Sequence, residues 1–374
     1  MELSVVILNY KVPHYLMLCL ESVSKAIKNM KAEIIVIDNN SEDESLALTH
    51  HHFPEVKTIA NKENAGFSKA NNLAVKQAKG EYLCILNPDT VVAEDCFEKL
   101  LKLYKSKKNL GAIGTQLIDG KGYFLPESKR NIPNPKVAFQ KLIGQDKDYY
   151  NNNLQTHENG KTDVLVGAFM FLKRQDYLTV KGFDEDFFMY GEDIDLSYKL
   201  LKNKRDNYYA GNIKTIHFKG ESTVKNKQYY DRFFGAMLIF YKKHYNNKLL
   251  EYSLKFALGF LKSTASQKKK NQTTETYHEA IIITDQQNNF KGLEKKFNKV
   301  YFYTKREIST INLSTLRKKY IIFDMSTMRY MEVIEKIVNW RDIPAKIRIR
   351  PEGINFCVGS DSKDEQGEML SLDL

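Results

Sequence analysis

The sequence predicts an α/β protein in which a parallel sheet is covered by helices. Over the first hundred residues, short apolar runs of strand length alternate with helix-like patterns. The apolar runs end in polar turn residues. Of the 374 residues 42% are hydrophobic, which is enough to form the cores of two or three domains. Such alternation is typical of parallel strands joined by helical crossovers.

The elements of this first region follow in order. Strands are predicted at residues 4–9, 33–38, 56–60 and 81–86, and helices at residues 14–26 and 67–79. The strand runs are almost continuously apolar, which is typical of strands buried on both faces. Polar residues stand at or just past the strand ends: Asn9, Asp38, Asn64 and Asp89. Because ligands of such sheets bind at the carboxyl ends of the strands, we expect these four side chains to line one crevice.

An acidic segment follows a less regular region with a strand-like run at residues 163–172. Residues 183–196 hold six carboxylates around the sequence Phe187-Phe188-Met189-Tyr190 and continue into an amphipathic helix. A solvated acidic segment does not carry four large apolar residues in its middle, so we interpret it as a packed loop that directs a carboxylate into a pocket. Partial burial of a carboxylate suits a general base. The alternative is a solvated turn before a helix, since acidic residues are common at helix starts.

Residues 226–262 carry two amphipathic helical patterns and an excess of positive charge. The segment 225–272 accounts for +9 of the net charge of +11. One apolar face is predicted from Tyr230, Phe233, Phe234, Met237, Leu238, Tyr241 and Tyr245, and a second from Leu250, Leu254, Ala257, Leu258 and Leu261. Such faces between lysines suit a helix lying on an anionic membrane. The alternative is that they dock on the rest of the protein.

A polar, lysine-rich linker is predicted at residues 263–276, followed by a small α/β domain at residues 277–362. Strands are expected at residues 280–284, 300–304, 320–324 and 346–350, and helices near Phe290 and at residues 328–340. Four charged residues of this domain, Arg348, Arg350, Glu352 and Asp361, are more simply explained as surface charge than as a site. The last dozen residues are expected to be disordered.

The cysteines and the apolar runs indicate a cytoplasmic protein. Its four cysteines are scattered without metal-like spacing, which favours a reducing compartment and excludes a cysteine zinc site. The N-terminus leads directly into a strand, so no signal peptide is expected. No apolar run approaches the roughly 20 residues of a membrane span.

Five sequence blocks stand in a fixed order along the first two thirds of the chain: Ser4–Tyr10, Ile35–Ser41, Asn64–Asn72, Leu86–Asp89 and Phe187–Leu196. Together they resemble family 2 glycosyltransferases of GT-A fold, a Rossmann-like nucleotide-diphospho-sugar transferase domain, over about residues 3–245. The similarity is strongest to the bacterial rhamnosyltransferase-like branch. The resemblance implies a catalytic domain at residues 1–225, which the basic amphipathic helical region predicted at residues 226–262 follows. The C-terminal domain lies outside the resemblance, which assigns it no role.

The resemblance also implies a metal site. The family usually binds its cation through an Asp-x-Asp triplet, which here is Asn87-Pro88-Asp89, so only Asp89 supplies a carboxylate. His217 resembles the late histidine that completes the metal shell. An aspartate, a histidine and diphosphate oxygens suit Mg²⁺ or Mn²⁺. The alternatives are that Asp89 caps a turn and that His217 is structural.

Further roles follow from the same resemblance. Asp193 is implied as the base, with Glu192 orienting the acceptor, although spacing alone does not decide among the three carboxylates that include Asp195. The nucleotide site is implied to contain Asn9, Asp38, Asn64, Gly66, Asn71 and Asp89. The sugar and acceptor pocket is implied to contain Gly167, Ala168 and Asp195. Asparagine is a poor helix former, so Asn71 and Asn72 are expected to point inward.

The sequence therefore predicts an inverting, metal-dependent hexosyltransferase of cell-surface polysaccharide synthesis. Its expected partners are a nucleotide-sugar donor and a glycan acceptor, for which a lipid-linked form fits the basic helices. We expect a cytoplasmic location with peripheral contact at the inner membrane face. A nucleotidyltransferase is disfavoured because residues 8–16 contain no glycine. A nucleic-acid-binding protein and a non-catalytic nucleotide-sugar sensor remain as alternatives.

Overall fold

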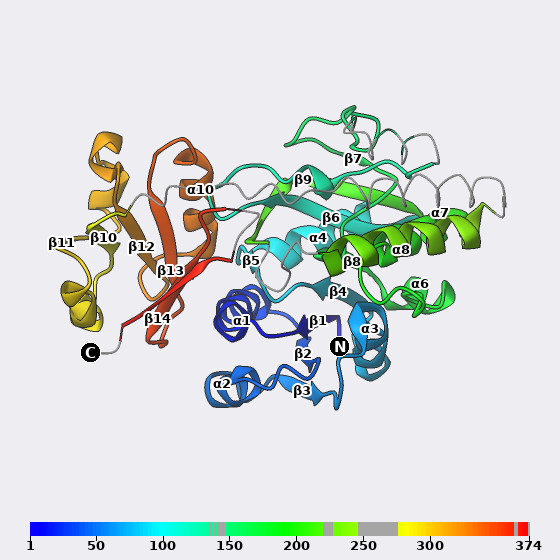
Figure 1. Cartoon of the computed structure of the whole chain (residues 1–374), viewed down its shortest axis with the longest axis horizontal. Coiled ribbons are helices and arrows are strands. Elements are labelled where there is room, and N and C mark those ends of the chain that lie inside the picture. Colours follow the sequence, from blue (N-terminus) through cyan, green and yellow to red (C-terminus); the bar gives the residue numbers. More distant parts are fainter. Residues whose placement is uncertain are drawn as a thin grey trace.

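The computed structural model of the chain describes residues 1–134, 137, 140, 145, 147–219, 227–245, 276–362 and 366–372. Two sheets organise these residues: a large sheet in the N-terminal part and a smaller one in the C-terminal module, residues 277–372 (Figure 1). The predictions for residues 246–275 lie outside the described residues. They include the second amphipathic pattern and nearly all of the linker.

Nine strands of the described chain form the large sheet: β1 (Leu3–Asn9), β2 (Ala32–Asp38), β3 (Lys57–Ala60), β4 (Tyr82–Leu86), β5 (Thr90–Val92), β6 (Leu110–Ile118), β7 (Asn159–Lys161), β8 (Phe169–Lys173) and β9 (Asp206–His217). Their order is β3-β2-β1-β4-β8-β6-β9-β5, and β7 pairs with β9. The first four strands are parallel, as predicted. β8 runs antiparallel between β4 and β6.

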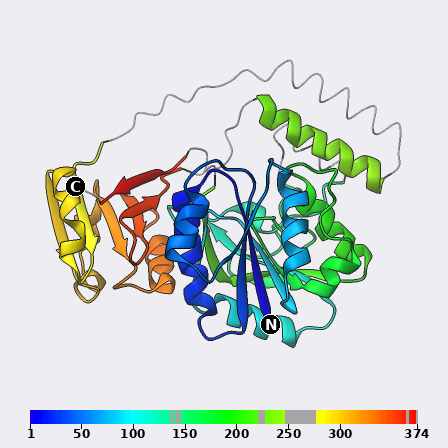
Figure 2. The ribbon, with the colours of Figure 1, turned by 90° about the horizontal axis from the view of Figure 1, so that it is seen from below.

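The helices of this part are α1 (Pro13–Ile27), α2 (Ser45–His52), α3 (Gly66–Gln77), α4 (Cys96–Ser106), α6 (Arg174–Thr179), α7 (Glu192–Lys202) and α8 (Lys227–His244). Pro13 opens α1, where its missing N–H costs nothing. Successive residues of β1 face opposite sides: Val5 and Ile7 pack with α1, and Val6 packs with α3. Figure 2 shows these two helices on either side of the first strands.

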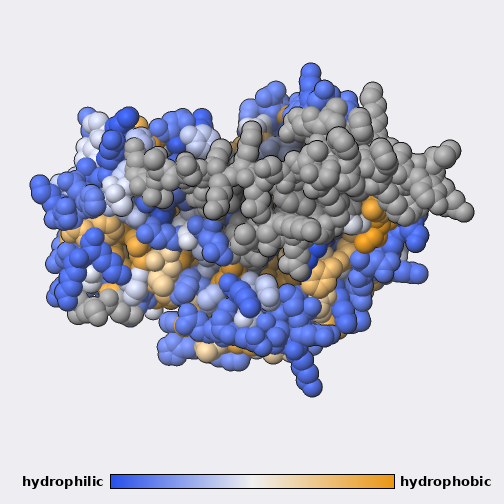
Figure 3. Space-filling view, in the orientation of Figure 1, coloured by the Kyte–Doolittle hydropathy of each residue, from blue (hydrophilic) through white to orange (hydrophobic). Residues whose placement is uncertain are grey.

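The C-terminal module is built on a six-stranded sheet with the order β11-β10-β12-β13-β14-β15. Its strands are β10 (Glu279–Ile283), β11 (Lys299–Tyr303), β12 (Tyr320–Asp324), β13 (Lys346–Arg350), β14 (Phe356–Gly359) and β15 (Glu368–Ser371), and its helix is α10 (Tyr330–Asn339). The segment near Phe290 is a 3-10 helix, Gln287–Lys295. On the face shown in Figure 3, apolar residues lie mainly over this sheet, whereas hydrophilic residues cover the region of α2 and β3.

Two expectations about the module are wrong. The last dozen residues are not all disordered, because Glu368–Ser371 forms β15 against β14. Arg348 and Arg350 are not surface charges: they are 1% and 4% exposed. Arg348 pairs with Asp361 and Glu368, and Arg350 pairs with Asp324, so burial of each guanidinium is compensated by an ion pair.

The module shares a hydrophobic core with the N-terminal part. One cluster of buried residues includes Leu16 of α1 and Val91 of β5 together with Ile337 of α10 and Phe356 of β14. Glu94 accepts hydrogen bonds from the backbone N–H groups of Tyr330 and Met331 at the start of α10. The position of a carboxylate at this helix start is also favoured by the helix dipole. The module is therefore packed against the N-terminal part through a shared hydrophobic core.

The described apolar face of α8 packs against the rest of the protein, which is the second of the two alternatives given for this helix. Ala236, Phe240 and Tyr241 are 5%, 2% and 3% exposed and pack with Phe187 of the acidic segment. The side chains of Tyr230, Phe233 and Phe234 lie outside the described residues. None of the helices in the described ranges combines the length and apolar character that a membrane span needs.

Candidate active site

Asn9 and Asp38 meet at the carboxyl ends of β1 and β2, as the strand register requires. The Asn9 amide donates to Asp38 Oδ1 at 2.7 Å and to Ser41 Oγ at 3.1 Å. Ser41 also donates its backbone N–H to Asp38 Oδ2 at 2.9 Å. Both Asn9 and Asp38 are buried, and among the described residues Asn9 Oδ1 has no hydrogen-bond partner. An unpaired buried acceptor is costly, so this oxygen is suited to receive a ligand donor.

The loop before α3 packs against the acidic segment. Gly66 has φ +78°, and a Cβ at this position would lie 2.6 Å from the carbonyl oxygen of Phe188. The backbone N–H of Phe67 donates to the same oxygen at 2.7 Å. Gly66 is therefore required by contact with the acidic segment, and its implied place in the nucleotide site stays a prediction. Asn64 is exposed, and its Oδ1 accepts from Gly66 and from Asn39.

The two asparagines of α3 have different tasks. Asn71 is fully buried and donates to the Phe67 carbonyl at 3.0 Å, while its Oδ1 has no partner among the described residues. Asn72 donates to the Phe183 carbonyl and accepts from the Phe183 N–H at 3.1 Å. It therefore holds the start of the acidic segment in place.

Asp89 and His217 come together from β4–β5 and the end of β9. Asp89 Oδ1 lies 3.4 Å from His217 Nε2, and the two residues are 6% and 7% exposed. Burial by itself raises the pKa of Asp89, but His217 and backbone N–H donors outweigh burial, so the pKa lies below its ordinary value. The carboxylate therefore stays ionised, as a metal ligand must.

This pair fits a divalent cation. The donors are a carboxylate oxygen and an imidazole nitrogen, and among the described residues His217 Nδ1 has no hydrogen-bond partner. No group of three His, Cys, Asp or Glu side chains suited to a metal is found in the described ranges. Two protein ligands are sufficient where substrate phosphates complete the shell, as they commonly do for Mg²⁺.

Asp193 is held by a residue that no sequence pattern indicated. Arg130 Nη2 lies 2.6 Å from Asp193 Oδ2, and the two side chains are almost fully buried. The Gly167 N–H donates to the same oxygen at 3.1 Å. Burial lowers the pKa of Arg130, but the neighbouring Asp193 carboxylate outweighs burial and the net pKa lies above its ordinary value. The ion pair compensates the burial of both groups.

Glu192 is a buried carboxyl group at the start of α7. Burial, reinforced by the nearby charge of Asp193, raises the pKa of Glu192 to about 8. Its carboxyl group therefore holds a proton at neutral pH, and among the described residues Oε2 has no hydrogen-bond partner. A buried carboxyl group that holds a proton can donate a hydrogen bond to a ligand.

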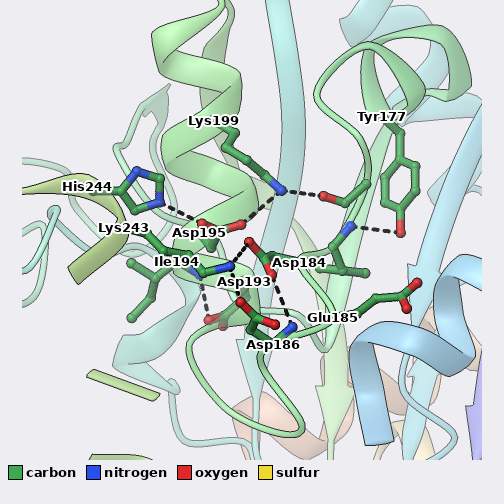
Figure 4. A network of polar contacts seen from close by, with 12 residues as sticks. Tyr177, Asp184, Glu185, Asp186, Asp193, Ile194, Asp195, Lys199, Lys243 and His244 are labelled. Carbon is green, nitrogen blue, oxygen red and sulfur yellow. Dashed lines mark hydrogen bonds and ion pairs between the residues drawn. The ribbon is translucent and has the colours of Figure 1, made fainter. Parts of the chain in front are cut away.

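Asp195, also on α7, lies between His244 and Lys199 (Figure 4). It is fully buried, with Oδ1 at 2.6 Å from His244 Nε2 and Oδ2 at 2.9 Å from Lys199 Nζ. Lys243 of α8 also pairs with Asp184 and Asp186. Asp195 thus joins α7 to α8, and α8 clamps the acidic segment.

Gly167 and Ala168 connect the two groups of candidate residues. Gly167 donates to Asp193, and Ala168 accepts the Asn87 N–H at 3.0 Å. The Asn87 side-chain nitrogen in turn lies 3.5 Å from His217 Nε2. The implied metal ligands and the implied base therefore border the same short stretch of backbone before β8.

Comparisons with known proteins show what the chain is similar to. Residues 4–178 match the sequence model of the family Glycosyl transferase family 2. The N-acetylglucosaminyl-diphospho-decaprenol L-rhamnosyltransferase of Mycobacterium tuberculosis is 25% identical over 242 residues, which cover 60% of this chain and 78% of that protein. The rhamnosyltransferase WbbL of Escherichia coli is 25% identical over 210 residues, covering 52% and 78%.

Among solved structures, a mannosyltransferase of Pyrobaculum calidifontis in complex with GDP-Man and Mn²⁺ aligns with a TM-score of 0.47 and 15% identity, covering 71% of this chain and 76% of that one. The sequence matches define the class as a glycosyltransferase. Residues 4–178 of this chain match glycosyltransferase family 2, and the chain is similar to the rhamnosyltransferase-like branch of that family.

Proposed function

We propose that this protein transfers a hexose from a nucleotide-diphosphate sugar to a lipid-linked glycan, with inversion at the anomeric carbon, in cell-surface polysaccharide synthesis. The observation that carries the proposal is the short link from Asp193 through Gly167 and Ala168 to Asn87 and His217. It gives one site both a base and a region suited to a diphosphate. The named relatives support the acceptor, because one of them acts on a diphospho-decaprenol sugar.

Asp193 is the proposed base. Its Oδ2 is occupied by Arg130 and Gly167, whereas Oδ1 accepts only from the backbone N–H of Ile194 among the described residues. Oδ1 takes the proton of the acceptor hydroxyl. At the same time the hydroxyl oxygen bonds to the anomeric carbon, and the bond from that carbon to the leaving diphosphate breaks. Glu192, protonated at neutral pH, donates a hydrogen bond to a sugar hydroxyl.

Asp89 and His217 are the proposed ligands of Mg²⁺ or Mn²⁺. When bound, the cation would stabilise the negative charge of the leaving nucleoside diphosphate. Asn9, Asp38, Asn64 and Asn71 are proposed to contact the nucleoside; Asn64 accepts a hydrogen bond from Asn39, the residue after Asp38. Peripheral membrane contact is proposed for the basic region 226–262, but not for the buried face of Ala236, Phe240 and Tyr241.

A panel of UDP-, dTDP- and GDP-sugars, tested by thermal shift with and without Mn²⁺, examines this proposal. A donor that binds the folded state raises the melting temperature by mass action. We expect stabilisation by one nucleotide class only with Mn²⁺. A folded sample that responds to none of the nucleotides, with or without metal, would exclude the proposal. Binding to RNA or DNA that weakens steeply with salt would instead favour the nucleic-acid alternative.

Arg130→Met is expected to lower both the transfer rate and the melting temperature. Without the guanidinium, Asp193 Oδ2 keeps only the Gly167 N–H as a donor, so the carboxylate is held less firmly. Removal of one partner from a buried ion pair typically destabilises the folded state by about 3 to 5 kcal/mol. Arg130→Lys, which keeps the charge but not the planar fork, should fall between wild type and Arg130→Met. The measurements are steady-state transfer and thermal unfolding, and wild-type values of both in Arg130→Met would contradict the assigned pairing.

A further inference from the structure

The residue after His217 is wedged against the C-terminal module. Phe218 is 2% exposed, and its ring lies 5.0 Å from the ring of Tyr15, centroid to centroid. Gly120 lies between Phe218 and the module: a Cβ there would be 2.5 Å from the Ser360 carbonyl oxygen and 3.0 Å from a Phe218 ring carbon. Phe218 is therefore enclosed by Tyr15 of α1 and by Gly120. Gly120 in turn lies against Ser360, which follows the end of β14.

Tyr15 connects this ring directly to the module. It stands in the first turn of α1, is 7% exposed, and donates its hydroxyl hydrogen to the Gly359 carbonyl at 3.0 Å. Gly359 is the last residue of β14, and Ser360 follows it. Two independent contacts, one through Tyr15 and one through Gly120, thus run from residues 359–360 to Phe218.

The backbone around Phe218 also holds the two candidate ligands together. The Phe218 N–H donates to the Asp89 carbonyl at 3.0 Å, and the Lys219 N–H donates to Asp89 Oδ2 at 3.1 Å. His217 is covalently adjacent and pairs across the sheet with Thr90. A shift of Phe218 would therefore move both His217 and the carboxylate that faces it.

We propose that the C-terminal module is a positioning part of the candidate metal site, with Tyr15 and residues 359–360 holding the His217–Lys219 segment in place. This inference rests on the proposed function. The physical reason is close packing, because a fully enclosed ring has no space to shift unless its neighbours move. Residues outside the ligand shell fix ligand geometry and are needed for full metal affinity.

The test is a titration of the full chain with Mn²⁺ in the presence of the nucleoside diphosphate that stabilises wild type. The EPR signal of free Mn²⁺ measures how much of the metal is bound at each point. Tyr15→Phe keeps the ring but loses the bond to Gly359. Gly120→Ala forces Ser360 and Phe218 apart. Outer-shell changes typically weaken metal binding about 10- to 100-fold. We expect about a tenfold higher Kd for Mn²⁺ in Tyr15→Phe, and at least as large a change in Gly120→Ala.

Tyr330→Phe is the matched control. Tyr330 is also a buried tyrosine whose hydroxyl crosses between the two parts, but it donates to Glu21 and not to Gly359. Its Mn²⁺ affinity should equal that of wild type. Equal affinity of folded Tyr15→Phe and Gly120→Ala with wild type, or equal loss in Tyr330→Phe, would overturn the inference while leaving the proposed function intact. Failure of wild type itself to bind Mn²⁺ would instead overturn the metal site, and this inference with it.

Discussion

Asp193→Asn is expected to lower kcat by about 10²- to 10⁴-fold, the contribution typical of a positioned general base. The amide keeps the size of the side chain, but it accepts no proton from the acceptor hydroxyl. Donor binding should be retained, because Asp193 lies on the side of Gly167 and Arg130 and not beside Asp89. The measurement is steady-state transfer to a synthetic acceptor, combined with thermal shift by the donor.

Two neighbouring carboxyl groups serve as controls for this prediction. Glu192→Gln should retain far more activity, since Glu192 already holds a proton at neutral pH and glutamine has the same shape. Asp195→Asn should lower the melting temperature more than kcat, because Asp195 joins α7 to α8 through Lys199 and His244. If Glu192→Gln loses activity as severely as Asp193→Asn, the base is not Asp193 alone.

Asp89→Ala is expected to abolish the Mn²⁺-dependent part of donor binding. Loss of an outer-shell partner weakens metal binding about 10- to 100-fold, and loss of a carboxylate ligand itself should exceed that range. The alanine also removes the acceptor of the Lys219 N–H and the partner of His217, so the segment after β9 loses its anchor. The measurement is the donor-induced thermal shift with and without Mn²⁺.

The control for Asp89→Ala is Asp176→Ala. Asp176 is also a buried aspartate with a basic partner, Arg205, but it is not a proposed ligand. It should leave the Mn²⁺ dependence in place. A donor shift in Asp89→Ala that still requires Mn²⁺ and has wild-type size would place the metal elsewhere in the protein.

The sheet positions of the first strands could be predicted because their residues are apolar on both faces. β1 (Leu3–Asn9) and β4 (Tyr82–Leu86) are buried almost throughout, and such runs are typical of central parallel strands. β6 (Leu110–Ile118) was not predicted, because Gly111 and Gly114 interrupt its apolar run. Those glycines are needed where Leu200 and Leu165 pack closely. A strand whose glycines serve tertiary packing resembles a loop in sequence.

The candidate site was predicted where its residues belong to local motifs. Asp193, Asp89 and Asn9 each follow a recognisable strand or acidic block, and the structure buries all three. Arg130 is separated from Asp193 by 63 positions and stands in an irregular region. Its partner is decided by the course of the chain in three dimensions, for which the local sequence carries no periodic signal.

The amphipathic pattern of α8 identified an apolar face but not what covers it. A membrane and a protein surface remove apolar area from water with similar gain, so hydrophobic periodicity cannot distinguish them. The distinguishing contacts are polar. Lys243 and His244 meet Asp184 and Asp195, whose positions became known only from the fold of the acidic segment.

One hydrophobic core includes residues of α1, β5, α10 and β14. This shared core constrains how the sequence can evolve. A substitution that alters the volume of Leu16 or Val91 must be accommodated by Ile337 or Phe356, although these lie hundreds of positions away along the gene. The transferase half and the C-terminal module are therefore bound to be inherited as a pair. Exchange of the module between relatives by recombination would succeed only if the facing surface of α1 were exchanged with it.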